Sequence, residues 1–128
     1  MDQYEAIRYK PFLATAPKDG KSWFLRVPYG KMPKKVILTL SLDIPTDSIL
    51  PLMEDVKKIS EFGEYSVYKG MFEGEELGVV YHASGTLSIT GAIEELCQLG
   101  VTCMLRTGNS GGLADEVHVG DYVLIDGA

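Results

Sequence analysis

The sequence is short of the features that mark membrane-spanning, secreted and metal-binding proteins. In its 128 residues no apolar run approaches the ~20 that a membrane helix needs, and the N-terminus lacks the basic and then apolar order of a signal peptide. Cys97 and Cys103 lie in apolar sequence and are expected to be reduced core residues, with a disulfide bond as the alternative. The two histidines, without cysteines or carboxylates at a suitable spacing, predict no metal site. We therefore expect a soluble, cytoplasmic protein with no metal and no membrane partner.

Positive charge is scarce outside the N-terminal part of the chain. Residues 1–35 hold eight Lys and Arg against three Asp and Glu, a net +5, whereas residues 36–128 hold four against fifteen, a net −11. The basic part also carries aromatic residues, a combination that can stack on nucleic acid. It has no RNA-binding signature, so we favour an extension that packs on its own acidic body or on a neighbouring subunit, and expect no nucleic-acid partner. We divide the chain into a basic, aromatic extension, residues 1–34, and an α/β domain, residues 35–128.

The first part of that domain reads as a strand followed by a helix. Residues 36–42 are apolar and β-rich, which is typical of a strand buried on both faces. Apolar residues at helical spacing then predict a helix that runs from Pro45 to Ile59, and Pro51 within it implies a late start or a kink.

The rest of the domain predicts a hairpin followed by a strand–helix–strand unit. Residues 65–72 and 76–82 read as an antiparallel hairpin. A helix that ends at Gly100 precedes a second buried strand over 101–106, a glycine-rich loop and a last strand over 117–126. Because a right-handed crossover makes the two flanking strands parallel, the loops after residues 82 and 106 are expected at one edge of the sheet. We predict an α/β fold with a mixed, partly parallel sheet and flanking helices.

Two residues at that edge are candidates for ligand binding. Arg106 directly precedes the glycine-rich loop, where its guanidinium and the backbone N–H groups could meet a phosphate. The alternative is that Arg106 pairs with an acidic residue and the glycines only make a turn. His82 ends the other strand and could bind substrate or act as an acid or base, although a structural histidine is the favoured interpretation. His118 is given no role.

The other polar side chains near this edge lack a catalytic context. Ser84 and Ser110 lie in loops, without the Gly-x-Ser-x-Gly pattern that marks a nucleophile. Glu95 is expected to point outward from its helix, and Asp121 follows a turn glycine. We predict that both carboxylates are solvated, and no catalytic residue is identified.

Several segments match a known family in order and spacing. They are Val36–Leu42, Lys69-Gly70, Tyr81–Gly85, Ile93–Gly100, Met104–Leu113 and Val119–Val123. With these segments the chain resembles the N-terminal half of the purine nucleoside and uridine phosphorylases. The resemblance implies phosphorolysis, in which phosphate attacks the anomeric carbon of a nucleoside and releases a free base and a pentose 1-phosphate. No metal or organic cofactor is implied, because phosphate is the co-substrate.

The resemblance also implies roles for residues of the two loops. Arg106 would hold phosphate, Gly108 would let the backbone approach it, and Asn109 stands where the family usually has a serine or threonine that contacts phosphate. The substrate loop, which faces the ribose in the family, keeps its histidine and last glycine as His82 and Gly85. Ala83 and Ser84 replace the family's glycine and methionine.

Two phosphate-binding arginines of the family have no counterpart. The family's Gly-Asp-Pro-x-Arg reads here as residues 41–47 without Gly or Arg, and residues 61–68, where a second arginine is expected, contain none. Each such charge-assisted contact is worth about 1.5–3 kcal/mol. Family members are also roughly twice as long. Whether the chain is an active enzyme is therefore left open.

Three interpretations follow. The chain is part of a nucleoside phosphorylase that acts on a purine nucleoside or uridine and needs a complementary piece, or a catalytically inactive relative that serves as a nucleoside-binding or regulatory subunit, or an unrelated small α/β domain. Under the first two we expect nucleoside and phosphate as ligands. The protein partner would be a second copy of the chain or a complementary or paralogous chain.

Overall fold

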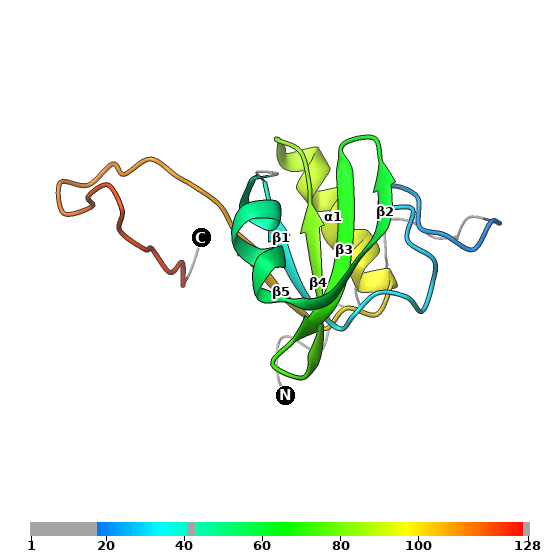
Figure 1. Ribbon diagram of the computed structural model, residues 1–128. Coiled ribbons are helices and arrows are strands. Elements are labelled where there is room, and N and C mark those ends of the chain that lie inside the picture. The colour runs from blue at the N-terminus through cyan, green and yellow to red at the C-terminus, as the bar shows by residue number, and fades with distance from the viewer. Residues whose placement is uncertain (1–17, 41–42, 127–128) are drawn as a thin grey trace, which may run out of the picture.

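A computed structural model describes residues 18–40 and 43–126 of the chain. Its centre is a five-stranded sheet in the order β2-β3-β4-β1-β5 (Figure 1). The strands are β1 (Lys35–Thr39), β2 (Glu54–Phe62), β3 (Tyr65–Phe72), β4 (Glu75–Tyr81) and β5 (Cys103–Thr107), and the helical elements are a π-helix η1 (Ile44–Ile49), a 3-10 turn η2 (Leu50–Leu52) and α1 (Thr86–Gln98). Strand β1 pairs in parallel with β4 and β5, whereas β3 pairs antiparallel with β2 and β4. The predicted mixed, partly parallel sheet is confirmed.

The predicted hairpin is formed by β3 and β4. Its connection is the two-residue turn Glu73-Gly74, in which both residues have positive φ angles, 49° and 83°. A turn with two positive φ angles has a backbone twist that matches the twist of the flanking strands, and glycine adopts a positive φ without strain.

Helix α1 covers one face of the sheet, and the core lies between them. Val67, Val80 and Leu38 stand side by side in the register of β3, β4 and β1, and Leu96 of α1 belongs to the same cluster. All four side chains are buried. Gly100, at φ 86°, follows α1 as predicted and turns the chain toward β5.

The segment before β1 is also part of this core. Leu25 and Val27 are fully buried, and Met32 is nearly so. They join the cluster that Leu38 and Leu96 form. The described part of the N-terminal segment therefore packs on its own body.

The predicted helix from Pro45 to Ile59 is wrong. Only η1 and η2 are helical, and the backbone is extended at Met53 before β2 begins. Pro51 has no backbone N–H to continue a helix, and the residues after it gain strand hydrogen bonds from β3, with Lys57 opposite Lys69. Pairing with β3 therefore determines the conformation of this segment, although its apolar spacing alone favours a helix.

The predicted last strand over 117–126 is absent from the described structure. The chain after β5 extends away from the sheet (Figure 1), and Val119 and Leu124 are almost fully exposed. A strand needs a neighbour for its backbone hydrogen bonds, and no described strand pairs with this segment.

Strand β5 forms the edge of the described sheet. The prediction that this strand is buried is wrong. It pairs only with β1, and the side chain of Leu105 is 55% exposed. Cys97 and Cys103 are not joined by a disulfide in the structure, and both are exposed, so the prediction that they are core residues is wrong.

Candidate functional site

The three parallel strands end together at one edge of the sheet. Thr39 of β1 lies opposite Tyr81 of β4 on one side and Thr107 of β5 on the other. The backbone N–H of His82 donates to the carbonyl oxygen of Thr39 at 3.0 Å, which extends this pairing by one residue. The loops that follow β4 and β5 therefore leave the sheet at the same edge, as the strand–helix–strand pattern predicts.

Arg106 is the penultimate residue of the strand β5, just before the glycine-rich loop. Its side chain is exposed, and a β-carbon built on Gly108 would lie 3.7 Å from Nη1 and 3.8 Å from Nη2. The guanidinium therefore folds back over the start of the loop. Within the described part of the chain no ion pair involves Arg106, so its charge is available to an anion. Asn109 follows in the same loop and is exposed.

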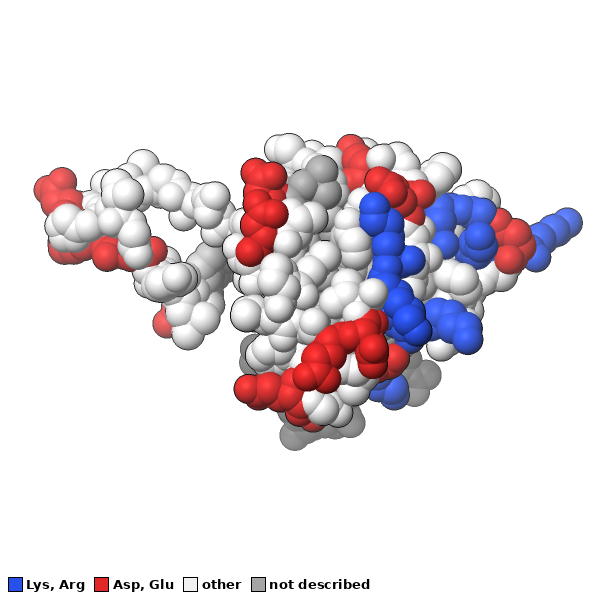
Figure 2. All heavy atoms as spheres, in the orientation of Figure 1, with Lys and Arg blue, Asp and Glu red and all other residues white. Residues whose placement is uncertain are grey.

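Few basic residues accompany Arg106 in its half of the chain. Arg106 is the only Lys or Arg after Lys69 in the sequence. Asp43 and Asp47, in the segment that follows β1, are exposed where the resembled family carries an arginine. Figure 2 shows basic side chains gathered over β2 and β3 and acidic ones at the turn between β3 and β4. Of the two described loops at this edge, only the one after β5 offers a cationic side chain, that of Arg106, to a phosphate, together with backbone N–H groups.

His82 is fixed by its own loop and keeps one nitrogen free. The side chain is 1% exposed, and Nδ1 lies 2.8 Å from the carbonyl oxygen of Ala83. Because a carbonyl oxygen only accepts hydrogen bonds, Nδ1 carries the proton and Nε2 of the neutral ring is an acceptor. Among the described residues Nε2 has no hydrogen-bond partner, and the same holds for Oγ1 of Thr107 and Oγ of Ser88. These buried polar atoms belong to the ends of β4 and β5 and the first turn of α1.

Ser84 and Gly85 connect His82 to α1 and are both exposed. Gly85 is the N-cap of α1, with φ 103° and ψ 154°, a conformation that favours glycine. No side chain caps this end of the helix, so the first backbone N–H groups of α1 remain open to the loop. The structure thus brings both predicted loops to one edge, but leaves Ser84 and Asn109 on the surface.

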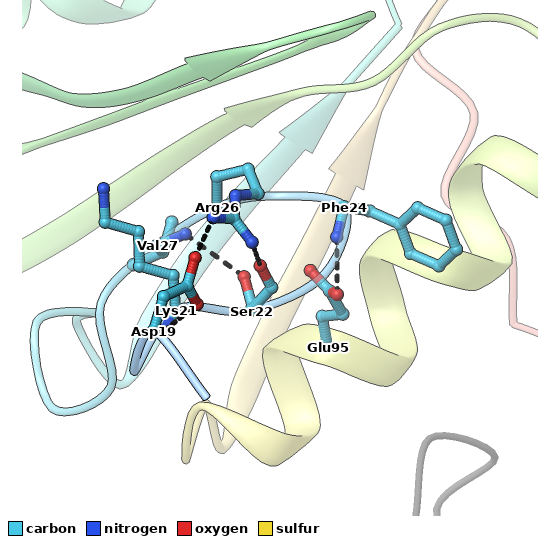
Figure 3. A network of polar contacts seen from close by, with 7 residues as sticks. All are labelled: Asp19, Lys21, Ser22, Phe24, Arg26, Val27 and Glu95. Carbon is cyan, nitrogen blue, oxygen red and sulfur yellow. Dashed lines mark hydrogen bonds and ion pairs between the residues drawn. The ribbon is translucent and has the colours of Figure 1, made fainter. Parts of the chain in front are cut away.

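Glu95 is the main residue whose place the sequence prediction missed. It is completely buried. Its carboxylate accepts hydrogen bonds from the backbone N–H of Phe24 at 2.6 Å (Figure 3) and from that of Leu25 at 2.8 Å. The prediction of a solvated Glu95 is wrong. The signal was present in the helical spacing, because Glu95 lies three residues after Ala92 and four before Leu99, both of which are buried.

The described residues contain neither a metal-binding cluster nor a membrane-spanning helix. No group of three or more His, Cys, Asp or Glu side chains among them is arranged to hold a metal ion. None of the helices in this part of the chain is long and apolar enough to cross a membrane.

Residues 35–128 match the model of the phosphorylase superfamily. A guanosine phosphorylase of Halorubrum lacusprofundi is 33% identical over 82 residues, which cover 64% of this chain and 34% of that protein. The uridine phosphorylase of Escherichia coli is 30% identical over 78 residues, 61% of this chain and 31% of that protein. The crystal structure of a uridine phosphorylase from Vibrio fischeri superposes with a TM-score of 0.74 at 27% identity, over 79% of this chain and 42% of that one. The matching region therefore spans about a third of the two curated relatives.

Proposed function

This chain belongs to the phosphorylase superfamily, and on that premise we propose that it takes part in the phosphorolysis of a purine nucleoside or uridine. In this reaction an oxygen of inorganic phosphate forms a bond to the anomeric carbon of the pentose. The bond from that carbon to the base nitrogen breaks, and the base leaves with the electron pair and takes up a proton. The products are the free base and the pentose 1-phosphate, and the proposal includes no metal or organic cofactor.

The observation that carries this proposal is the shared edge of β4, β1 and β5. In our assignment Arg106, Gly108 and Asn109 hold phosphate through the guanidinium, the backbone N–H groups and the amide. His82, Ser84 and Gly85 form the loop that faces the ribose. Catalysis at such a site consists of holding phosphate beneath a carbon that becomes positively charged. Positioning of the reactants and electrostatic stabilisation therefore provide most of the rate enhancement.

We further propose that another polypeptide completes the site. The chain matches about a third of each curated relative, and one arginine provides the only positive side chain of the described phosphate loop. In this proposal a second copy of the chain, or a complementary or paralogous chain, supplies further contacts to phosphate and to the base.

A nucleoside cleavage assay tests the proposal. The 128-residue chain is incubated with inosine, guanosine or uridine, with and without phosphate, alone and together with the C-terminal part of a uridine phosphorylase. We expect base release that requires phosphate and that appears or rises when the complementary part is present. If the chain binds a nucleoside as a stable oligomer and never cleaves it, the nucleoside-binding or regulatory subunit replaces this proposal. If it neither binds nor cleaves, the proposal fails.

A further inference from the structure

We propose that residues 19–33 form a strap that holds α1 and the loop 82–85 in position, and that Glu95 is the positioning residue that anchors it. The strap lies ahead of the region that matches the family model. This inference rests on the proposed function only in treating the loop 82–85 as part of a substrate site. The contacts described below stand independently of it.

The anchor is a buried carboxylate that accepts hydrogen bonds from the strap backbone. Oε1 of Glu95 accepts from the backbone N–H of Phe24, and Oε2 accepts from that of Leu25. No Lys, Arg or His of the described residues forms an ion pair with Glu95, whose side chain is inaccessible to solvent. A buried carboxylate without a cation is costly unless it is hydrogen-bonded. The carboxylate and the strap backbone therefore depend on each other.

The strap is also closed on itself by contacts between its own residues. The backbone N–H of Ser22 donates to the carbonyl oxygen of Val27 at 3.0 Å, and Oγ of Ser22 accepts from the Val27 N–H at 3.2 Å. Arg26 pairs with Asp19, and the hydrogen bond from Arg26 lowers the pKa of the Asp19 carboxyl below its ordinary value. Figure 3 shows these contacts on one side of the strap and Glu95 reaching it from α1 on the other. Little further ordering is needed for the strap to bind the helix.

A continuous row of contacts leads from the strap to the site loop. The ring of Phe24 packs on Gly91 of α1, and its centroid lies 6.4 Å from that of Tyr65. Oη of Tyr65 donates to the carbonyl oxygen of Ser88 at 3.1 Å, in the first turn of α1. The register of β3 on β4 brings Tyr65 to the end of the sheet where His82 begins the loop. Phe24 thus packs on both Gly91 and Tyr65, and Tyr65 is hydrogen-bonded to the first turn of α1.

Trp23 reports whether the strap is docked. It is the only tryptophan of the chain, lies next to Phe24 and is 50% exposed. We compare Glu95→Ala with Glu94→Ala, a neighbouring substitution on the same helix that leaves the anchor intact. Full exposure would raise acrylamide quenching of Trp23 about two-fold in Glu95→Ala and shift its emission to the red, at temperatures where circular dichroism shows intact secondary structure. Glu94→Ala is expected to match the unmodified chain, and Glu95→Gln, which keeps one acceptor oxygen, to lie between.

A second measurement follows the effect at the site. The imidazole ¹⁵N signals of His82 are compared with those of His118, whose side chain is 76% exposed. Phe24→Ala keeps the backbone bonds to Glu95 but removes the ring that supports Tyr65. We expect it to shift and broaden the His82 signals, while Leu87→Ala, at an exposed position in the first turn of α1, leaves them unchanged.

Three results would overturn the proposal. They are unchanged Trp23 quenching in folded Glu95→Ala, unchanged His82 signals in Phe24→Ala, and amide protons of Phe24 and Leu25 that exchange in the unmodified chain as fast as those of a free loop. The last measurement requires no substitution and therefore decides the case where a variant does not fold. None of these readouts uses phosphate or a nucleoside. Failure of the strap and failure of the proposed function are therefore distinguishable.

Discussion

Replacing Gly91 by alanine tests how the strap packs on α1 with a single added methyl group. At an unhindered helix position this change stabilises a protein by about 0.8–1 kcal/mol, because alanine loses less backbone entropy than glycine. Here the new β-carbon would lie 3.1 Å from Cδ2 and 3.2 Å from Cε2 of Phe24. Carbon atoms pack best at about 3.5–4.0 Å, so the ring must move and its packing on Tyr65 weakens. We expect the helical gain to be cancelled in the unmodified background.

A double-mutant cycle measures this cancellation. Urea unfolding is followed by circular dichroism for the unmodified chain, Gly91→Ala, Phe24→Ala and the double variant. Gly91→Ala alone is expected to leave the unfolding free energy unchanged or lower it. In the Phe24→Ala background, where the ring is gone, the same substitution should raise it by about 1 kcal/mol. An equal gain in both backgrounds would refute the packing of Phe24 on Gly91.

Three further predictions concern other parts of the fold. Leu96→Ala removes a fully buried core side chain and should lower the free energy of unfolding by about 2–5 kcal/mol in urea titrations, whereas a loss near zero would place Leu96 outside the core. Gly70→Ala would bring a β-carbon 2.8 Å from the backbone oxygen of Glu54 and should cost about 1–3 kcal/mol by the same measurement, while Gly111→Ala, in open space, should be neutral. Partial desolvation of the sulfur by neighbouring atoms, with a smaller effect of the Glu94 carboxylate, raises the pKa of the otherwise exposed Cys97 thiol, so less thiolate is present at pH 8. Alkylation by iodoacetamide, followed by peptide mass spectrometry, should therefore be slower than for N-acetylcysteine, and an equal or faster rate contradicts this.

Local patterns predicted the elements whose partners are near in sequence. The hairpin of β3 and β4 needs only a two-residue turn, and α1 is delimited by the glycines at 85 and 100. The crossover through α1 correctly predicted that β4 and β5 are parallel, but not that β1 lies between them and pairs with both. That geometry brings the loops of His82 and Arg106 to one edge, which is why the candidate site could be predicted at all.

The errors arose where distant residues decide the structure. Val56 and Ile59 continue a helical spacing, but the strand β3 offers backbone hydrogen bonds that turn their segment into β2. Glu95 looked solvated because carboxylates usually are, yet its partners Phe24 and Leu25 lie 71 and 70 residues earlier in the chain. Spacing within the helix contained the signal for burial, but only the strap explains how a carboxylate can be buried there.

The central claim is that the loop after β5 binds phosphate through Arg106. Thermal unfolding measured with increasing sodium phosphate, against sodium chloride at equal ionic strength, tests it most directly. At a phosphate concentration ten times Kd, binding to the native state adds about 1.4 kcal/mol to the free energy of unfolding, so Tm should rise with phosphate in the unmodified chain and stay constant in Arg106→Ala. A Tm that does not respond to phosphate in the unmodified chain, or that responds equally in both, would contradict the claim.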